Sequence, residues 1–489
     1  MTGYTERVVI IGAGISGLAC AYRLKQLGIR SLVLEAKERA GGVIATIRRN
    51  GFLFEAGPQC PRFPASVWRL VRDLSLESRF VPGDPKATRY ILRHGRLDPA
   101  PFSPAGLVTT RLVGLRSKFR ILTEVFRSSR PPVHEESLAE FVERKFGGEV
   151  LDNLVDPFIA TIFLGDSHKM GMESAFPALV EWERNRGSLV RGAIRARKSK
   201  QNAGKVDESS TGSRANGSRG ALHVTDALPS LGSFMTGMGE LPERLAQELQ
   251  PEIRYNAEIG SVARLEDNSG AAKEGWEIGL AGGNKITAET LVLAVPAYVA
   301  AQLLVCGAPQ LARSLQAIEY APMCAVSCAY DCSQVAHPLD GFGFMVPRRE
   351  GLKTICTFWN SSLFPQRAPE GKVLMTSFAR TEARDNECAQ IVEAENAKTL
   401  GITGSPVDRL VWKDSRALPQ YNVGHAQRVT EIAGILRTVP NLYLLGNFLR
   451  GRSIGDCVEV AMRVAEEMHS HLRGKVIQTT EGFVQESRS

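Results

Sequence analysis

The sequence predicts a mixed α/β fold that is divided into more than one domain. Its 489 residues exceed the roughly 250–300 at which a single hydrophobic core stops growing, so we expect two or three domains. Residues 8–35 read as a buried strand, a glycine-rich turn, an apolar helix and a second strand. Another buried strand, stopped by a proline, is expected at residues 291–296. The unit that begins at the N-terminus is therefore expected to continue much later in the chain.

The composition is that of a soluble globular protein. Apolar residues make up 43% of the chain and charged residues 23%. No apolar run reaches the ~18–20 residues of a membrane span, and the first strand begins too early for a cleavable leader. We therefore expect a cytoplasmic protein whose membrane contact, if it has any, is peripheral. The net charge of +8 is modest, and aromatic and basic residues do not alternate, so no nucleic-acid partner is expected.

The nine cysteines are an odd number without paired spacing, which predicts reduced thiols. Cys324, Cys328 and Cys332 are spaced like the ligands of a metal cluster. The segment around them reads better as a buried strand, and no histidine nearby completes a ligand set. We expect no metal site.

The most specific motif lies between the first strand and the first helix. Residues 12–17 read GAGISG, a G-x-G-x-x-G pattern whose glycines permit a tight turn and the close approach of a pyrophosphate. The phosphates would then lie at the N-terminus of the helix. Glu35, 18 residues after Gly17, ends the second strand, where its carboxylate can accept hydrogen bonds from ribose hydroxyls. Together these features predict a bound dinucleotide rather than an empty glycine turn.

Further glycine loops favour FAD over NAD. Residues 39–42 (RAGG) and 54–58 (FEAGP) suit a cofactor that extends beyond one dinucleotide turn. Gly446, Gly451 and Gly455 precede a last helix expected from Asp456 to residue 471, whose positive dipole end would stabilise an anionic reduced flavin. The alternative for this last block is a simple capped helix.

These blocks resemble the amine-oxidase-like FAD flavoprotein superfamily. Interior segments resemble the oxygen-dependent protoporphyrinogen/coproporphyrinogen oxidase family of haem biosynthesis. The segments that carry the resemblance are RYILRHG (89–95), FLGDSHKMGMESAFPAL (163–179), GSLVRG (187–192), GFGFMVP (341–347), LFPQRAPEGKVL (363–374), ALPQYNVGH (417–425) and RSIGDCVE (452–459).

The resemblance implies a six-electron oxidation of a porphyrinogen, in three flavin cycles that each reduce O2 to hydrogen peroxide. The substrate is protoporphyrinogen IX or coproporphyrinogen III, and ferrochelatase would be the next enzyme. Hydride leaves a methylene bridge while a pyrrole nitrogen loses its proton, so no strong acid or base from the protein is required. Monomer and homodimer both stay open.

By the same resemblance, the fold is a Rossmann-type FAD-binding domain with an inserted substrate-binding α+β domain and a helical subdomain. The FAD-binding domain is expected at residues 1–65, 225–298 and 428–475, and the substrate-binding domain at 66–90 and 299–427. Residues 91–198 would form the helical, membrane-associating domain. The polar composition of residues 199–220 predicts a disordered loop, and 476–489 a flexible tail.

Four residues are expected at the substrate. Arg89 matches an arginine that binds a propionate, which a guanidinium can clamp through two hydrogen bonds. Met345 and Phe364 match side chains that sandwich the macrocycle, and Gly165 a glycine whose backbone faces it. Taken alone, these are a surface arginine, two core side chains and a turn glycine. The cofactor residues implied are Gly12, Ala13, Gly14, Ile15, Ser16, Gly17, Glu35, Ala36, Arg39, Gly42, Val43, Gly57, Pro58, Gln59, Cys60, Val262, Trp412, Gly446, Arg452, Ser453, Ile454 and Asp456.

Two departures from the family pattern concern the substrate rather than the flavin. The family's usual GDP reads Gly165-Asp166-Ser167 here, and residues 60–62 (CPR) lie where members vary. One alternative is another flavin amine oxidase or polyene desaturase. An amine oxidase should carry an aromatic cage, which the last motif does not supply. A second alternative is a flavin- or porphyrin-binding carrier without turnover.

An anionic membrane surface is a further expected partner. In residues 107–126, apolar residues recur every three or four positions and four basic residues lie between them, so one helix there would be amphipathic and basic. Residues 184–200 add a basic run. The alternative is that the stripe packs inside a helical core. The apolar positions are Val108, Leu112, Leu115, Phe119, Leu122 and Phe126.

Overall fold

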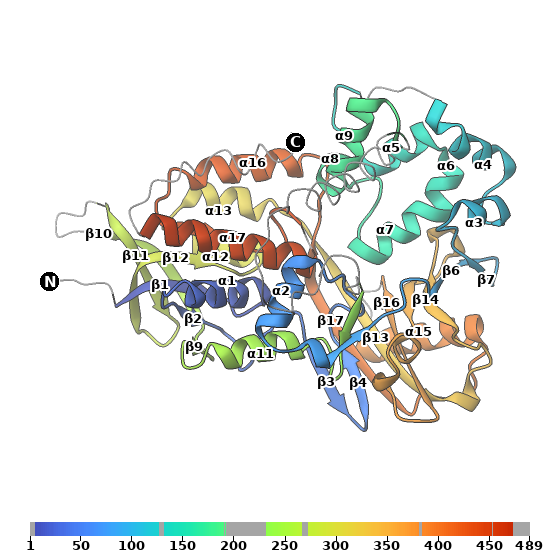
Figure 1. Ribbon diagram of the computed structural model, residues 1–489, viewed down its shortest axis with the longest axis horizontal. Helices are drawn as coiled ribbons and strands as arrows, with labels where there is room; N and C mark the ends of the chain where they lie inside the picture. Colours follow the sequence, from blue (N-terminus) through green and yellow to red (C-terminus); the bar gives the residue numbers. More distant parts are fainter. Residues whose placement is uncertain are drawn as a thin grey trace, which may run out of the picture.

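The computed structural model describes residues 5–126, 132–189, 191, 231–266, 272–380, 384–451 and 453–472 (Figure 1). Two seven-stranded sheets and a group of helices make up this part of the chain. No described helix is long and apolar enough to cross a membrane. The expected loop 199–220, the tail 476–489 and most of the basic run 184–200 lie outside the described residues.

The first sheet has the order β10-β11-β12-β1-β2-β9, with β18 beside β12. β1 lies between β2 and β12 and is parallel to both, which confirms the expected strand–helix–strand unit. Its last four residues, Val8 to Ile11, are buried on both faces, as in doubly covered parallel sheets. The strands are β1 (Glu6–Ile11), β2 (Leu32–Leu34), β9 (Ile253–Arg254), β10 (Ile259–Glu266), β11 (Ala272–Leu280), β12 (Lys285–Leu293) and β18 (Leu442–Leu444).

Helices cover both faces of this sheet because neighbouring β1 residues point in opposite directions. Val8 and Ile10 pack with α1, α2, α11 and α17, whereas Val9 and Ile11 pack with α12, α13 and α16. α1 and α17 lie side by side in Figure 1. The helices are α1 (Ile15–Gln26), α2 (Ala65–Asp73), α11 (Glu240–Glu248), α12 (Ala297–Leu303), α13 (Pro309–Gln316), α16 (His425–Leu436) and α17 (Ile454–Leu472).

The second sheet has the order β17-β13-β16-β15-β14-β6-β7 and is mainly antiparallel. The buried strand expected around Cys324 and Cys328 is confirmed as β13, which ends just before Cys332. The strands are β6 (Thr88–Arg93), β7 (Arg96–Pro99), β13 (Tyr320–Asp331), β14 (Gly341–Met345), β15 (Thr354–Phe358), β16 (Lys372–Ala379) and β17 (Asp408–Pro419). Two short pairs, β3 (Thr46–Arg49) with β4 (Phe52–Glu55) and β5 (Phe80–Pro82) with β8 (Gly232–Phe234), lie outside both sheets.

The packing of these elements bears on where the domain boundaries proposed from the sequence should lie. α2, α12 and α13 were assigned to the substrate-binding domain, but their buried side chains belong to the cores of the first sheet. β6 and β7 join the second sheet, although the proposed helical domain starts at residue 91. We propose moving these segments accordingly.

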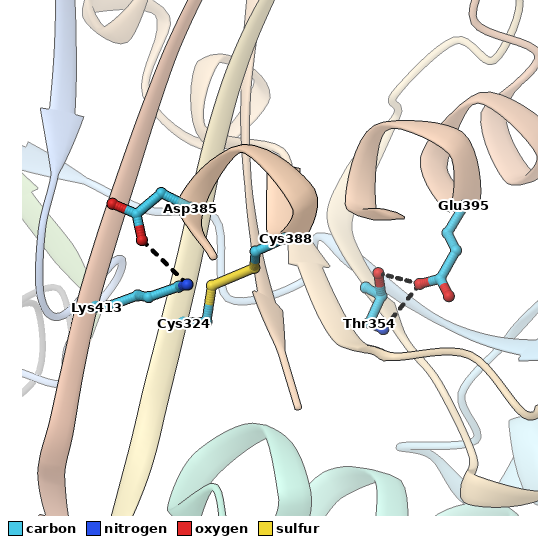
Figure 2. Close-up of a disulfide and its surroundings, with 6 residues drawn as sticks. All are labelled: Cys324, Thr354, Asp385, Cys388, Glu395 and Lys413. Atoms are coloured by element: carbon cyan, nitrogen blue, oxygen red, sulfur yellow. Dashed lines mark hydrogen bonds and ion pairs between the residues drawn. A yellow bond between two sulfur atoms is a disulfide. The ribbon is translucent and has the colours of Figure 1, made fainter. Parts of the chain in front are cut away.

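Helix α15 (Asp385–Leu400) packs on one face of the second sheet, and Figure 2 shows its Cys388 joined to Cys324. Cys388 of α15 forms a disulfide with Cys324 of β13. Asp385 and Lys413 form an ion pair of 3.0 Å beside it. The expectation of reduced thiols is therefore wrong for this pair, because the fold brings together two cysteines that are 64 residues apart in the sequence.

The helices between residues 104 and 186 form a third unit with its own core. They are α3 (Pro104–Thr109), α4 (Leu115–Leu122), α5 (Leu138–Lys145), α6 (Gly148–Val150), α7 (Asp156–Phe163), α8 (Met172–Ala175) and α9 (Pro177–Arg186). The short helix α14 (Asn360–Leu363) is not part of this unit and follows β15. The single amphipathic helix expected over residues 107–126 is wrong. The helical conformation is interrupted between α3 and α4. Leu112 in this interval is fully buried, and its carbonyl accepts a hydrogen bond from Asn153 Nδ2 at 2.6 Å.

Candidate functional site

The turn between β1 and α1 is shaped by close backbone approach. A Cβ atom on Gly17 would lie 2.0 Å from the Gly12 carbonyl oxygen, and one on Gly12 would lie 2.5 Å from that of Ala294. At Gly14, the N-cap of α1, nothing lies within 4 Å of the Cβ position. The turn therefore leaves open space at the positive end of α1, which fits a pyrophosphate. Ile15 and Ser16 open the helix.

Glu35 is fixed beside this turn. Its Oε2 accepts a hydrogen bond from the Ala13 amide at 2.8 Å, and its Oε1 accepts one from the Lys37 amide at 3.0 Å. Ala36 lies between Glu35 and Lys37 in the sequence. Each carboxylate oxygen keeps a second lone pair, so Glu35 can still accept hydrogen bonds from ribose hydroxyls.

A second glycine loop lies against the first. The Gly41 amide donates to the Ala13 carbonyl at 2.8 Å, and a Cβ on Gly42 would lie 3.3 Å from Gly14 Cα. Arg39 Nη2 donates to the Gly42 carbonyl at 2.9 Å, while Val43 is 62% exposed. The second loop therefore packs directly against the first turn.

Gln59 links the turn at residues 57–60 to α14. Its Nε2 donates to the Gly57 carbonyl at 2.8 Å, and its Oε1 accepts from Asn360 Nδ2 at 2.7 Å. Pro58 lies between Gly57 and Gln59, and Cys60 follows. Both amide side chains are buried, so the expected flavin turn and the helix that precedes Phe364 are held together.

The C-terminal motif meets the N-terminal one. Ser453 Oγ donates to Asp456 Oδ2 at 2.6 Å, and the Asp456 amide donates back to Ser453 Oγ at 3.1 Å, which caps α17. The side chains of Ser16 and Cys457 are in contact, and Ile454 shares a core with the first turn. Gly446 follows β18.

Of the other expected cofactor residues, two stand apart from this group. Arg452 lies outside the described residues. Val262 of β10 is fully buried in the core that contains Ile11. Trp412 of β17 packs against the apolar cluster of the second sheet that contains Met345.

Arg89 and Met345 lie on one face of the second sheet. Gly343 pairs with Arg89 and Met345 pairs with Ile91, so both side chains point to the face opposite α15. The Arg89 guanidinium lies 4.4 Å from the ring centroid of Phe342. Burial lowers the pKa of Arg89 and the nearby charge of Arg62 lowers it further, while Cys60 and Asp84 oppose this shift. Within the described residues, Arg89 forms no ion pair and its guanidinium donates only to the carbonyls of Pro85 and Ala87, so it has donors that a carboxylate ligand can use.

Phe364 lies fully buried after α14, near Cys60 and Gly83. The Arg367 guanidinium lies 5.2 Å from its ring centroid and forms a buried ion pair of 2.8 Å with Glu55. Burial raises the pKa of Cys60 to about 12, so its thiol stays protonated. The structure brings Phe364 and Cys60 together, but it places Met345 in a different apolar cluster.

Gly165 lies in the turn after α7. Leu164 adopts a left-handed conformation (φ 50°) and packs against the cluster that contains Met345. A Cβ on Gly165 would lie 2.6 Å from Gln420 Oε1, and the Gly165 carbonyl accepts from Arg348 Nη2 at 3.4 Å. Gly165 therefore allows the turn to pack closely against the second sheet.

Phe342, Arg62 and Arg348 were not singled out from the sequence. Phe342 is the second residue of the GFGFMVP motif, Arg348 directly follows that motif, and Arg62 lies in the CPR segment. The sequence analysis considered only Arg89 as a substrate-binding cation. Arg62 and Arg348 could have been found as further arginines within or next to the same motifs.

A model of the family described as flavin containing amine oxidoreductase matches residues 15–469. The chain belongs to this family. Protoporphyrinogen oxidase 1 from the chloroplast of Arabidopsis thaliana is 31% identical over 96% of this chain and 89% of its own length. Coproporphyrinogen III oxidase of Bacillus subtilis is 26% identical over 96% of this chain and 100% of its own length.

Solved structures share the fold. A protein of Exiguobacterium sp. 255-15, assigned as a protoporphyrinogen oxidase, has a TM-score of 0.76 at 24% identity and covers 96% of this chain and 99% of its own. Putrescine oxidase with bound putrescine has a TM-score of 0.64 at 18% identity and covers 95% and 98%. The chain is thus an FAD-dependent oxidoreductase of mixed α/β fold, in the group that contains protoporphyrinogen and coproporphyrinogen oxidases.

Proposed function

We propose that this enzyme oxidises a porphyrinogen, protoporphyrinogen IX or coproporphyrinogen III, to the porphyrin. The observation that carries the proposal is Arg89, a half-buried cation that forms no ion pair within the described part of the chain and stands over the Phe342 ring on an apolar sheet face. That combination suits a flat apolar macrocycle with carboxylate arms. The names of the relatives support the same substrate class.

Bound FAD would accept hydride from the substrate and return electrons to O2. The protein's own residues bind and orient: Arg89 would hold a propionate, and Met345 and Phe364 would supply apolar walls. Cys60 would stay a neutral thiol because burial raises its pKa to about 12. We assign no side chain as general acid or base, since the pyrrole nitrogen can lose its proton directly. A metal-inserting enzyme such as ferrochelatase would consume the product.

Anaerobic reduction of the purified flavoprotein tests this proposal. Either porphyrinogen should bleach the flavin absorbance, and air should restore it with release of peroxide. Steady-state kinetics with both substrates would then identify the preferred one. Bleaching by an amine such as putrescine, without bleaching by porphyrinogens, would favour the amine-oxidase alternative. Porphyrin binding without bleaching would indicate a carrier.

We also propose that the helical unit contacts an anionic membrane surface. Between residues 108 and 126, five large apolar side chains are more than half exposed, and we call them the α3–α4 patch: Val108, Leu115, Phe119, Leu122 and Phe126. Arg111 and Arg116 are exposed beside them. Apolar side chains flanked by arginines suit the headgroup region of anionic lipid.

A further inference from the structure

A network of polar contacts holds the turn at residues 163–167 against the second sheet. Arg348 Nε donates to Asp156 Oδ2 at 3.0 Å, while its Nη2 reaches the Gly165 carbonyl and Asp166 Oδ1, both at 3.4 Å. Ser167 Oγ donates to Asp156 Oδ1 at 2.7 Å. One guanidinium therefore contacts both the first residue of α7 and the turn after its last residue.

The network connects two units of the fold. Arg348 begins the 3-10 turn Arg348–Glu350, three residues after Met345 ends β14. Asp156 and Ser167 belong to the helical unit and are nearly or fully buried. Burying a carboxylate costs free energy unless its oxygens are paired. The arrangement in which Arg348 and Ser167 donate to the two Asp156 oxygens is therefore strongly favoured.

Gln420 adds a second contact at the same turn. Its Nε2 donates to the Phe163 carbonyl at 3.1 Å, and it follows β17, the strand of Trp412. Leu164 meanwhile packs on the cluster of Met345. The turn is thus fixed by residues that follow β14 and β17, the strands that line the expected substrate face.

We propose that Arg348, Asp156 and Ser167 are positioning residues that set where the Gly165 backbone meets the substrate. The inference rests on the proposed function. The resembling family has proline at the third position of the GDP pattern, and proline stiffens a turn by fixing φ. In this chain the Ser167 hydroxyl supplies the constraint through Asp156 instead.

The experiment measures the rate of anaerobic flavin reduction in Arg348→Met and Ser167→Ala. Because displacing a positioned group by about 1 Å can cost up to ~10²-fold in rate, we expect losses of about tenfold or more in the limiting rate. The flavin content and the visible spectrum should not change. Arg49→Met is the matched control, because the Arg49–Asp408 pair has side chains 41% and 11% exposed against 42% and 8% for Arg348–Asp156.

Arg348→Lys separates positioning from stability. A lysine can pair with Asp156 but lacks the fork that also reaches Gly165, so it should restore the melting temperature without restoring the rate. Recovery of the rate together with the melting temperature would overturn the inference, as would wild-type rates in Ser167→Ala. If the porphyrinogen does not reduce the wild-type flavin, the proposed function fails instead.

Discussion

Arg89 is the residue at which substrate binding and catalysis should separate most clearly. Its guanidinium stands on the Phe342 ring, and a propionate there is remote from the bond that breaks. We therefore expect Arg89→Ala to raise KM by about tenfold or more while changing kcat much less, because uniform binding is lost. Steady-state kinetics measure both constants.

The control for Arg89 is Arg96→Ala, an exposed arginine on the neighbouring strand β7. It should leave KM unchanged. An unchanged KM in Arg89→Ala, combined with slower flavin reduction, would instead place Arg89 at the reacting part of the substrate.

Gly14 reports on the cofactor without disturbing the fold. Its φ is −71° and its Cβ position is open, so alanine fits the protein itself. A methyl group there would occupy the space expected for the pyrophosphate. We expect Gly14→Ala to weaken FAD binding by about tenfold or more, since close backbone approach is what the motif provides.

Equilibrium dialysis or the flavin-to-protein absorbance ratio would measure this loss. Gly434→Ala is the control, because Gly434 is exposed within α16 and also has nothing within 4 Å of its Cβ position. That variant should keep its flavin. Full occupancy in Gly14→Ala would argue against phosphates at this turn.

His425 should make the protein sensitive to acid. Its ring is buried and stacked on Tyr421 at 4.3 Å, and burial lowers its pKa to about 4. Between that value and the ordinary 6.5, the unfolded chain binds a proton that the folded one does not, so stability falls as pH falls. The loss at pH 5 should be about 2 kcal/mol of unfolding free energy.

Melting temperatures of wild type and His425→Phe from pH 7 to pH 5 test this expectation. Phenylalanine keeps the stacking on Tyr421 and cannot titrate, so the variant should lose less stability on acidification. His471→Gln, at an exposed position, should behave like wild type. Equal slopes for all three proteins would show that His425 is not the group responsible.

At the scale of elements, the sequence predicted those whose signals are local. β1, α1 and β2 follow from an apolar run and a glycine motif, and the Ala13–Glu35 contact follows from their spacing. The break between α3 and α4 was missed, because it depends on Leu112 being buried against a distant segment. Arg348 was missed for the same reason, since its partner Asp156 is 192 residues away.

The disulfide that joins α15 to β13 predicts how many thiols can be titrated. Seven cysteines are free, of which Cys306 and Cys332 are exposed, while Cys324 and Cys388 are bonded. Burial raises the pKa values of Cys20, Cys60, Cys328, Cys356 and Cys457 well above their usual range. Colorimetric titration of the native protein should therefore detect two fast thiols.

Unfolding without reductant should raise the titre to the seven free thiols, and only prior reduction should expose all nine cysteines. Nine thiols without reductant would show that Cys324 and Cys388 are separate thiols in solution. The Cys324→Ser variant is the control, because it should add Cys388 as a free thiol and remove the dependence on reductant.

At the scale of the whole molecule, three separated stretches of sequence build the flavin side. α1 and α17 lie together although one opens the chain and the other closes its described part (Figure 1). The glycine motifs at both ends predicted this meeting. The side chains on the second sheet could not be placed in advance, since their faces depend on register and on the bulge near Gly343.

Helices α3 and α4, which carry most of the α3–α4 patch, lie at the outer edge of the helical unit, away from the first sheet (Figure 1). If the patch binds membranes, the protein should float with anionic vesicles at low salt and less at high salt, because each cation near the surface contributes about 1 kcal/mol that salt screens. Neutral vesicles should capture little. Flotation in a density gradient measures all three conditions.

Substitution within the patch should separate membrane contact from general stickiness. Leu115 and Phe119 are 83% and 66% exposed and lie one helical turn apart on α4, so Leu115→Ser with Phe119→Ser removes apolar surface from one face. Val305→Ser is the control, since Val305 is 60% exposed and lies just after α12, a helix that covers the first sheet. We expect the double variant to stay in solution and the control to float as the wild type does. If wild type fails to float with anionic vesicles even at low salt, the patch has another role and the porphyrinogen must reach the enzyme from solution.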